Sequence, residues 1–427
     1  MRTTMATENN NKNLNVPNKR EQSQTCLGYA ERKEQSPQGN VPNLRFPEFS
    51  GEWERNELQK VATLSKGTGI SKDQLADSGH PCILYGELYT KYKSEIIEEV
   101  YSKTQLDAAN LVKSQTNDVI IPCSGEAAIE IATARCVLTP NVLLGGDLNI
   151  IRLNGHDGGF FAYQLNGKRK VDIAKVAQGV SVVHLYGEHL KKVKVAYPSL
   201  AEQQKIAEML SLLDERIATQ IKIIEKLESL IRGISNNLLY SESGTPVRLG
   251  DILSERSERT KVNNQHEVLS STVKGIFSQR EYFSKDIASE NNVGYKIIRL
   301  HDVVLSPQNL WMGNVNYNDK FDIGIVSPSY KIFSIADGYD QRFVAAMLKT
   351  HRALYNYMLV SEQGASVVRR NLNMEAFEQL VFKMPPIDKQ REIGNAISAL
   401  QSRLELAVRV KTAYEKQKQW LLTEMFI

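Results

Sequence analysis

The sequence predicts an α+β protein built from two copies of one unit, each an α/β domain followed by a long helix. Three observations support this prediction. A helical segment occurs twice, short motifs before it recur in the same order, and one apolar stripe runs along each copy of the helix. We expect the two helices to pack antiparallel as a coiled coil, with a domain at each end and a pseudo-twofold axis between the halves.

Length and composition limit the class of protein. At 427 residues the chain exceeds the size that one hydrophobic core supports, so several domains are expected. A content of 41% hydrophobic and 24% charged residues is typical of a soluble globular protein. The net charge of +4 permits an acidic partner without requiring one. The cysteines lack the spacing of zinc ligands, so we predict no metal site; they are Cys26, Cys82, Cys123 and Cys136.

The N-terminal region, residues 1–40, is rich in Asn, Lys, Glu, Gln and Ser, which predicts a disordered tail. It has no apolar core of signal-peptide length, and no apolar run in the chain is long enough to span a bilayer. With cysteines that suit a reducing compartment, this predicts a cytoplasmic protein with no membrane partner. The expected organisation is a domain over 41–197, a central helix over 198–242, a second domain over 243–384 and a distal helix over 385–427.

The repeated helical segment reads "YPSLAEQQKIAEMLSLLDERI" at residues 197–217 and "MPPIDKQREIGNAISALQSRL" at residues 384–404. Aligned without gaps, the two share several identical residues, among them Gln203 and Gln390. Motifs upstream recur as well. The motif that begins with Asp-Val starts 60 residues before the QGxSVV motif in the first copy and 61 residues before it in the second. The pairs are "DVIIP" (118–122) with "DVVLSP" (302–307), "QGVSVV" (178–183) with "QGASVV" (363–368), and "ELQKVATL" (57–64) with "VRLGDIL" (247–253).

The apolar stripe steps by alternating fours and threes, which is the pattern of a coiled-coil seam. Gln220 interrupts it in the first copy, where a polar residue would fix the helix register, and Lys411 and Lys418 interrupt it in the second. The seam residues are Ile206, Leu210, Leu213, Ile217, Ile224, Leu227 and Ile231 in the first helix and Ile393, Ile397, Leu400 and Leu404 in the second.

Helix ends are marked by local signals. Ser199 with Glu202 forms a capping-box pattern, Pro385 suits the first turn of the second helix, and Gly244 with Pro246 ends the first. Each helix is then about 40 residues, or roughly 60 Å. The domains show short apolar strands such as "DVIIP", "LNIIRL" (148–153), "KIIRL" (296–300) and "YKIFSI" (330–335), and residues 342–358 have helical spacing.

The pattern "EQQKIAEMLSLLDERI", repeated as "PPIDKQREIGNAISAL" after a second variable domain, resembles the specificity subunit of type I restriction–modification systems. The resemblance extends from about Val41 to the C-terminus and includes "VPNLRFPEFSGEWE" (41–54) and "LYGELYTKY" (84–92). It implies two target-recognition domains, each reading half of a split DNA sequence, with the helices as spacer. It also implies that two methyltransferase subunits and further restriction subunits bind this protein. The second copy departs at Lys389, where the first has Glu202, so a docking role for the acidic residue does not transfer.

No catalytic motif is found. "MPPI" at residues 384–387 has the two prolines of a methyltransferase loop but neither the polar residue before them nor the aromatic residue after them. No phosphate loop of the form GxxxxGK[ST] occurs. We therefore predict no catalytic residue and no cofactor on this chain. S-adenosylmethionine, ATP and Mg²⁺ are expected on the partner subunits.

Reading of base edges requires Arg, Lys, Asn, Gln or His side chains on loops that reach the major groove. The stretch after each QGxSVV motif is a candidate, because one repeated scaffold carries different side chains there in the two copies. The alternative is that its arginines are surface charges. The candidates for contact with double-stranded DNA are Arg369, Arg370, Asn371 and Asn373 in the second copy and His184 and Tyr186 in the first.

Two basic or aromatic stretches are further candidates. Lys168, Arg169 and Lys170 in "GKRK" could hold phosphates, or form a solvated turn. Tyr89 and Lys91 in "YTKY" could contact DNA, or the tyrosine could pack in the core.

Gln308 and Asn309 are also candidates, because they follow a strand and a proline in a loop that matches "CSGE" (123–126) of the first copy. Two functions remain open from the residues alone. One is a DNA-binding specificity subunit, which the resemblance favours. The other is a coiled-coil scaffold that bridges two proteins without reading DNA. A self-contained nuclease or methylase is disfavoured by the missing motifs.

Overall fold

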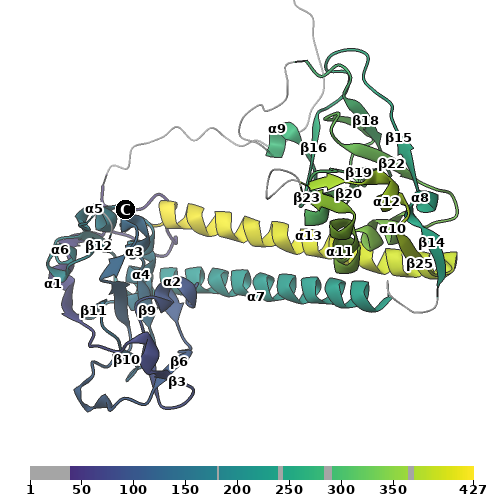
Figure 1. Ribbon diagram of the computed structural model, residues 1–427. Helices are drawn as coiled ribbons and strands as arrows, with labels where there is room; N and C mark the ends of the chain where they lie inside the picture. Colours follow the sequence, from purple (N-terminus) through teal and green to yellow (C-terminus); the bar gives the residue numbers. More distant parts are fainter. Residues whose placement is uncertain (1–38, 180–181, 239–243, 283–290, 364–369) are drawn as a thin grey trace, which may run out of the picture.

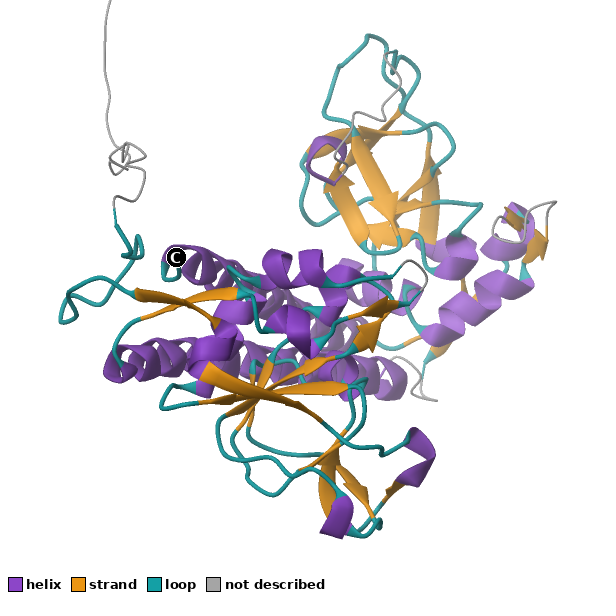
Figure 2. Ribbon diagram, turned by 90° about the vertical axis from the view of Figure 1, so that its left-hand side faces the viewer, coloured by secondary structure: helices purple, strands orange, loops and turns teal. Residues whose placement is uncertain are grey.

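The computed structural model describes residues 39–179, 182–238, 244–282, 291–363 and 370–427, so residues 1–38 of the predicted tail (1–40) lie outside the described residues. Two long helices, α7 (Leu200–Leu238) and α13 (Ile387–Glu424), run antiparallel side by side, with one globular domain at each end (Figure 1). In the sequence, domain 1 precedes α7, and domain 2 is formed by the residues between α7 and α13. Figure 2 shows most strands of domain 1 in the lower part of the view and the main sheets of domain 2 in the upper part. This is the predicted fold class.

Both domains begin and end with the same arrangement. A strand, a one-turn helix and a second strand open each domain, and the first strand pairs antiparallel with the strand that leads into the long helix. In domain 1 these elements are β1 (Glu54–Glu57), α1 (Leu58–Val61), β2 (Ala62–Lys66) and β13 (Lys194–Tyr197). In domain 2 they are β14 (Thr245–Arg248), α8 (Leu249–Ile252), β15 (Leu253–Arg256) and β25 (Val381–Met384).

The central sheets also correspond. Their orders are β2-β11-β7-β9-β5 in domain 1 and β15-β22-β19-β20 in domain 2, antiparallel except for the β5–β9 pair. Domain 1 uses β5 (Ile96–Ile97), β7 (Asp118–Pro122), β9 (Arg135–Val137) and β11 (Leu148–Leu153). Domain 2 uses β19 (Val303–Leu305), β20 (Val315–Tyr317) and β22 (Lys331–Ile335). The strands predicted from "DVIIP", "LNIIRL" and "YKIFSI" are thus confirmed.

The parts of the domains away from the helix pair differ. Domain 1 adds a sheet of order β10-β4-β6-β3, whereas domain 2 adds the antiparallel pairs β16–β17 and β18–β21. These strands are β3 (Leu75–Ala76), β4 (His80–Ile83), β6 (Ser102–Thr104), β10 (Leu143–Leu144), β16 (Leu269–Thr272), β17 (Gly275–Ser278), β18 (Lys296–Arg299) and β21 (Ile323–Val326). Two domains with a shared base and different distal parts are what the repeat predicts.

Short helices complete the domains. Domain 1 has η1 (Lys72–Gln74), α2 (Glu87–Thr90), η2 (Ala108–Asn110), α3 (Ala128–Ile131), α4 (Gly158–Asn166), α5 (Lys170–Val176) and α6 (Gly187–Leu190). Domain 2 has α9 (Gln279–Tyr282), η3 (Leu310–Met312), α10 (Gln341–Leu348), α11 (His351–Leu359) and α12 (Met374–Glu378). Residues 342–358 therefore form two helices, because the Thr350 side chain caps α11 by accepting a hydrogen bond from the Ala353 amide.

The repeated glutamines bind each long helix to its domain. The Gln203 side chain accepts a hydrogen bond from the Asp157 amide at 3.0 Å and donates one to the Pro198 carbonyl at 2.8 Å. Gln390 repeats both contacts, with the Asp340 amide at 3.0 Å and the Pro385 carbonyl at 2.8 Å. The two aspartates are the N-caps of α4 and α10. One buried amide in each half thus fixes the start of the long helix against the start of a short one.

The close approach at this contact needs a glycine in each half. On α4, a Cβ at Gly159 would come within 3.3 Å of the Ala207 Cβ on α7. In domain 2 the small residue lies on the long helix, where a Cβ at Gly394 would meet the Asp340 carboxylate at 2.5 Å. In each half a glycine thus lies at this contact, on the short helix in domain 1 and on the long helix in domain 2.

The predicted seam residues of both helices are each buried or half-buried. Ile206, Leu210 and Leu213 belong to the core of domain 1, while Ile393 and Ile397 belong to that of domain 2. The remaining seam residues are half-buried, as expected along a helix pair that the domains cover only in part.

Lys418, which interrupts the predicted stripe, is the centre of a buried charge cluster. Its ammonium lies 2.5 Å from the Glu95 carboxylate of domain 1 and 2.5 Å from Asp214 on α7, with all three side chains at most 11% exposed. The Tyr163 hydroxyl donates to Asp214 at 2.8 Å. Burial alone raises the pKa of Glu95, but the charges of Lys418 and Arg135 outweigh it and lower this pKa. The cluster joins α13, α7 and domain 1 at one point.

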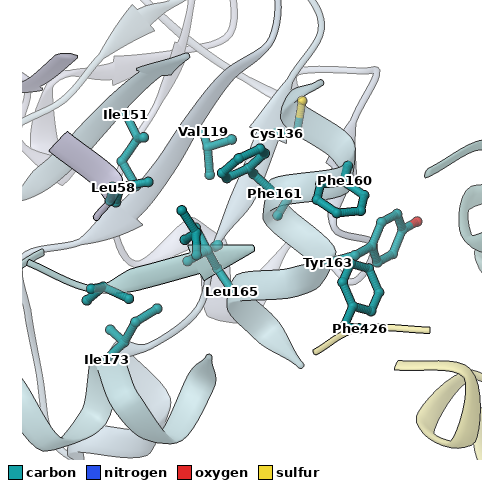
Figure 3. Close-up of a cluster of buried hydrophobic side chains, with 14 of the residues drawn as sticks. Leu58, Val119, Cys136, Ile151, Phe160, Phe161, Tyr163, Leu165, Ile173 and Phe426 are labelled. Atoms are coloured by element: carbon teal, nitrogen blue, oxygen red, sulfur yellow. The ribbon is translucent and has the colours of Figure 1, made fainter. Parts of the chain in front are cut away.

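The C-terminal end of α13 also inserts into the core of domain 1, and Figure 3 shows Phe426 beside Phe160 and Tyr163. The ring centroids of Phe160 and Phe426 are 5.2 Å apart, and Trp53 packs on Phe426 at 6.3 Å. Leu421 and Leu422 of α13 are buried in the same core.

At the domain 2 end, the helix pair makes different contacts with its domain. In the register of the repeat, Ile231 corresponds to Lys418 and Gln401 to Asp214. These two residues line a cavity of about 140 Å³ beside Lys349 and Thr350 of domain 2. Among the described residues, the ion cluster therefore has no counterpart at the domain 2 end.

At the start of α7, Glu202 binds an arginine instead of taking part in the expected capping box. Its carboxylate accepts two hydrogen bonds of 2.7 Å from the Arg45 guanidinium. The segment before β1 is thereby tied to α7, and the Leu44 amide donates to the Glu424 carbonyl of α13 at 2.9 Å. In domain 2 the corresponding Lys389 is exposed.

We predict that Lys418→Met lowers the free energy of unfolding by about 3–5 kcal/mol, because two buried carboxylates lose their cation. Urea denaturation checks this, with the exposed Lys416→Met on the same helix as control. The triple variant E95Q/D214N/K418M should regain more than half of the loss. A Lys418→Met variant as stable as its control would contradict a central role for the cluster.

We also predict that Gln203→Ala and Gln390→Ala each cost about 1–3 kcal/mol, because each leaves a buried amide without its acceptor. The exposed neighbour Gln204→Ala should be close to neutral. Equal denaturation midpoints for all three variants would show that the repeated glutamine is not a structural clamp.

Candidate nucleic-acid interface

In domain 2, two segments singled out in the sequence lie together. The strand after "QGASVV", β24 (Arg370–Leu372), pairs with β23 (Ser361–Gln363), and the Arg370 amide donates a hydrogen bond to the Gln308 carbonyl at 3.1 Å. Asn371 and Gln308 are exposed, while Asn309 is half-buried. We call this patch surface 2; it consists of Gln308, Asn309, Trp311, Arg370 and Asn371.

Arg370 is the cation of surface 2. Its guanidinium carbon lies 4.7 Å from the ring centroid of Trp311, over the indole. One terminal nitrogen approaches the Met358 carbonyl at 3.5 Å, and the buried Nε has no hydrogen-bond partner among the described residues. No ion pair to Arg370 is formed within the described part of the chain. The terminal nitrogens of the guanidinium therefore keep donor capacity for an external acceptor, whereas the buried Nε is not accessible to one.

Domain 1 has a corresponding patch. There β12 (Val183–His184) pairs with β8 (Ser124–Gly125), and the Leu185 amide donates to the Cys123 carbonyl at 2.7 Å. His184 and Tyr186 are both exposed, and their rings stack with centroids 6.1 Å apart. We call this patch surface 1; it consists of Ser124, His184 and Tyr186. The two surfaces occupy matching places in the repeat with different side chains.

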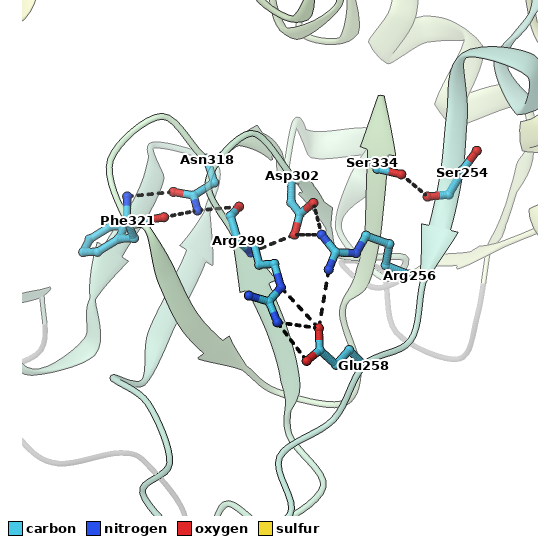
Figure 4. A network of polar contacts seen from close by, with 8 residues as sticks. All are labelled: Ser254, Arg256, Glu258, Arg299, Asp302, Asn318, Phe321 and Ser334. Atoms are coloured by element: carbon cyan, nitrogen blue, oxygen red, sulfur yellow. Dashed lines mark hydrogen bonds and ion pairs between the residues drawn. The ribbon is translucent and has the colours of Figure 1, made fainter. Parts of the chain in front are cut away.

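Two other arginines of domain 2 are paired within the chain. Figure 4 shows Arg256 and Arg299 both held by Glu258, and Arg256 also bound to Asp302 at 2.9 Å. Asp302 opens the "DVVLSP" motif, and Asp118 of "DVIIP" binds Arg152 in the same way at 2.8 Å. The aspartates of this repeated motif thus have a structural role.

Two predicted candidates in domain 2 fall elsewhere. Asn373 is the N-cap of α12, where its side-chain oxygen accepts a hydrogen bond from the Ala376 amide at 3.0 Å. Arg369 lies outside the described residues.

The "GKRK" stretch divides into two parts. The Lys168 ammonium donates to the Thr423 carbonyl at the end of α13 at 3.1 Å, and Arg169 donates to the Ile427 carbonyl at 2.6 Å. These two side chains therefore contact the C-terminal segment. Lys170 lines a cavity of about 370 Å³ together with Tyr89.

This cavity is bordered by three cations, Lys93, Arg135 and Lys170, and by Glu130. The Tyr89 hydroxyl is buried without a hydrogen-bond partner among the described residues, and burial raises its pKa. Burial lowers the pKa of Lys170, and the nearby Arg135 charge adds to this effect.

Lys91, the other candidate of "YTKY", has partners within domain 1. Its ammonium donates to the Ser102 hydroxyl at 2.5 Å and pairs with Glu87 at 2.7 Å.

The sequence reasoning missed Trp311, which lies two residues after the candidate Asn309 and could have been found as an aromatic residue beside a candidate base-reading loop. It also missed the helix caps Asp157 and Asp340, although "DGGF" and "DQRF" form a repeated D-x-x-F pattern before the long helices.

The described cysteines, Cys82, Cys123 and Cys136, are buried and free. Within the described ranges, no group of three or more His, Cys, Asp or Glu side chains is placed to hold a metal ion. A search of the described helices finds none with the length and apolar character needed to cross a membrane.

Comparisons with known proteins agree with this architecture. Residues 50–229 match the family model of the type I restriction modification DNA specificity domain. A curated relative from Methanocaldococcus jannaschii, described as the MjaX type I restriction enzyme specificity subunit, is 22% identical over 419 residues, covering 90% of this chain and 95% of the relative. The crystal structure of the type I restriction–modification S subunit from M. genitalium superposes with a TM-score of 0.61 at 15% identity, covering 91% of this chain and 99% of that one. Residues 50–229 thus match the type I restriction modification DNA specificity domain, and about nine-tenths of the chain is similar to specificity subunits of type I restriction–modification systems.

Proposed function

We propose that this chain reads a bipartite, asymmetric DNA target, one block with each domain, and directs methyltransferase and restriction subunits to it. The observation that carries the proposal is the pair of matching surfaces. Surface 1 presents His184 and Tyr186, whereas surface 2 presents Arg370 and Asn371 on the same scaffold. Because His, Arg and Asn match different base edges, the two blocks have different sequences.

The helix pair serves as the spacer between the blocks. With 39 residues, α7 is about 58 Å long at 1.5 Å per residue. Half-sites on one face of DNA lie about 34–36 Å apart for each helical turn. Two domains at opposite ends of such a rod can therefore reach successive major-groove sites, and the rod length sets the gap between the blocks.

Phosphate contacts would position the domains on the duplex. Lys170 with its cationic neighbours Lys93 and Arg135 is suited to this role in domain 1, with Tyr89 beside them. Arg369, Lys91, Lys168 and Arg169 are included as secondary candidates, although the last three already have partners in the chain. Asn373 and Asn309 are assigned mainly to support of the loops.

The rod offers surfaces for partner subunits. Leu212, Ile223 and Leu230 of α7 and Leu406 and Val408 of α13 are exposed apolar side chains. We propose that two methyltransferase subunits bind along the helix pair, one for each half, and that restriction subunits join them. S-adenosylmethionine, ATP and Mg²⁺ would be bound by those partners. The complex would act in the cytoplasm.

The proposal is tested by mapping adenine methylation across the genome in cells that carry this chain with its cognate methyltransferase subunit. We expect a new motif of two short, different blocks around a fixed gap. Cells without the chain are the control. A complex that assembles but gives no motif would contradict the proposal.

Arg370→Ala should relax the block read by domain 2 and leave the other block unchanged. The double variant H184A/Y186A should do the reverse, because the two surfaces lie at opposite ends of the rod. Methylation motifs of the variants check this. Loss of both blocks in either variant would show a defect of folding or assembly instead of reading.

Binding of DNA should weaken steeply with salt, because neutralised phosphates release counterions. If six to ten phosphates are contacted, affinity should fall about 10³- to 10⁵-fold between 50 and 200 mM salt. Fluorescence anisotropy with a duplex that carries the mapped motif measures this. A salt-independent affinity would contradict contact with the phosphate backbone.

A further inference from the structure

We infer that Trp311 is a positioning residue that holds the Arg370 guanidinium for bidentate hydrogen bonding to a guanine in the block read by domain 2. This inference rests on the proposed function and deepens it. The guanidinium stacks over the indole at 4.7 Å. A planar fork with a fixed orientation matches the paired N7 and O6 acceptors of guanine, which is the commonest specific contact of arginine in the major groove.

Trp311 itself is rigidly placed. It lies on η3, whose first residue, Leu310, is fully buried in the core of domain 2. The turn closes with hydrogen bonds from the Met312 amide to the Asn309 carbonyl at 3.1 Å and from the Gly313 amide to the Leu310 carbonyl at 2.8 Å. Gly313 has a φ of +95°, a conformation that favours glycine. The indole therefore has little freedom to follow a mobile arginine.

Arg370 is restrained from the other sides. Its backbone is held by the pairing of β24 with β23 and by the hydrogen bond to Gln308. The Met358 carbonyl of α11 accepts a hydrogen bond of 3.5 Å from one terminal nitrogen of Arg370. A mobile arginine side chain loses rotamer freedom when it binds DNA, whereas a side chain that is already stacked loses less. The restraint thus favours specific binding.

The charge of Arg370 is left for an external acceptor. The neighbouring carboxylate on β23 is Glu362, which lies opposite Asn371 in the strand register and makes no ion pair with Arg370 among the described residues. By contrast, Arg256 and Arg299 of the same domain are bound by carboxylates. Acceptors on DNA include phosphates and several base edges, but guanine alone presents the paired N7 and O6 acceptors that fit a stacked, planar guanidinium.

The test uses two matched substitutions of Trp311. Leucine retains apolar packing but has no ring face, whereas phenylalanine retains the ring. The full chain is assembled with its methyltransferase subunits and selected on duplexes randomised in the domain 2 block, with the domain 1 block intact. Tyr355→Ala, at an exposed position of α11, is the control variant.

We expect Arg370→Ala to abolish the preference for guanine at one position, a loss of about 5- to 150-fold in discrimination. Trp311→Leu should relax the same position several-fold, and Trp311→Phe should restore most of the preference. The preference for the domain 1 block should be unchanged in every variant, which shows that the complex is folded and assembled.

Three outcomes would overturn the inference. Trp311→Leu could leave the position as specific as the parent while Arg370→Ala relaxes it, which would remove Trp311 from positioning. Arg370→Ala could lower affinity equally for all sequences and reduce the salt slope by about one, which is the signature of a phosphate contact. Alternatively, Trp311→Leu and Trp311→Phe could relax the position equally. Failure of the proposed function is distinct, since the parent complex would then select no block in either half.

Discussion

The arrangement of the whole molecule depends on the buried contact between Lys418, Glu95 and Asp214. These residues come from the last helix, the first domain and the central helix, and the Lys418 ammonium lies 2.5 Å from each carboxylate at a buried position. A buried cation is stable only when its partners are in place, so the contact fixes the register of α13 on α7 and the position of domain 1 on both. The insertion of Phe426 into the domain 1 core adds apolar packing at the same end.

The two halves share one arrangement, but the far end of each long helix makes different contacts with the other domain. Gln203 and Gln390 make the same pair of hydrogen bonds, so each domain is fixed in the same way to the start of its long helix. The far end of each helix meets the other domain, and there the halves differ. Domain 1 receives the ion cluster and the apolar end of α13, whereas domain 2 meets α7 across a cavity beside Ile231 and Gln401. A common base with dissimilar ends suits a protein whose domains read different sequences.

In the proposed function, DNA recognition and structural support use different residues of the repeat. The motif residues that recur unchanged, such as Asp118 with Asp302 and Gln203 with Gln390, support strands and helices. The residues that change between copies lie on surfaces 1 and 2 at the ends of those supports. Because function requires variation at the surfaces while the fold requires constancy beneath them, the positions that differ between the copies are where specificity is expected.

The amino-acid sequence alone determined the two-unit plan, the long antiparallel helices and their seam, because hydrophobic periodicity and the internal repeat are local signals. It also placed Gln308 and Arg370 among the candidates, although only the tertiary structure brought them together through β24. Lys418 was visible only as an interruption of a stripe, since its partners lie 204 and 323 residues away. The uses of Lys168, Arg169 and Glu202 were likewise decided by tertiary contacts, because charged side chains in a sequence do not reveal which distant group they meet.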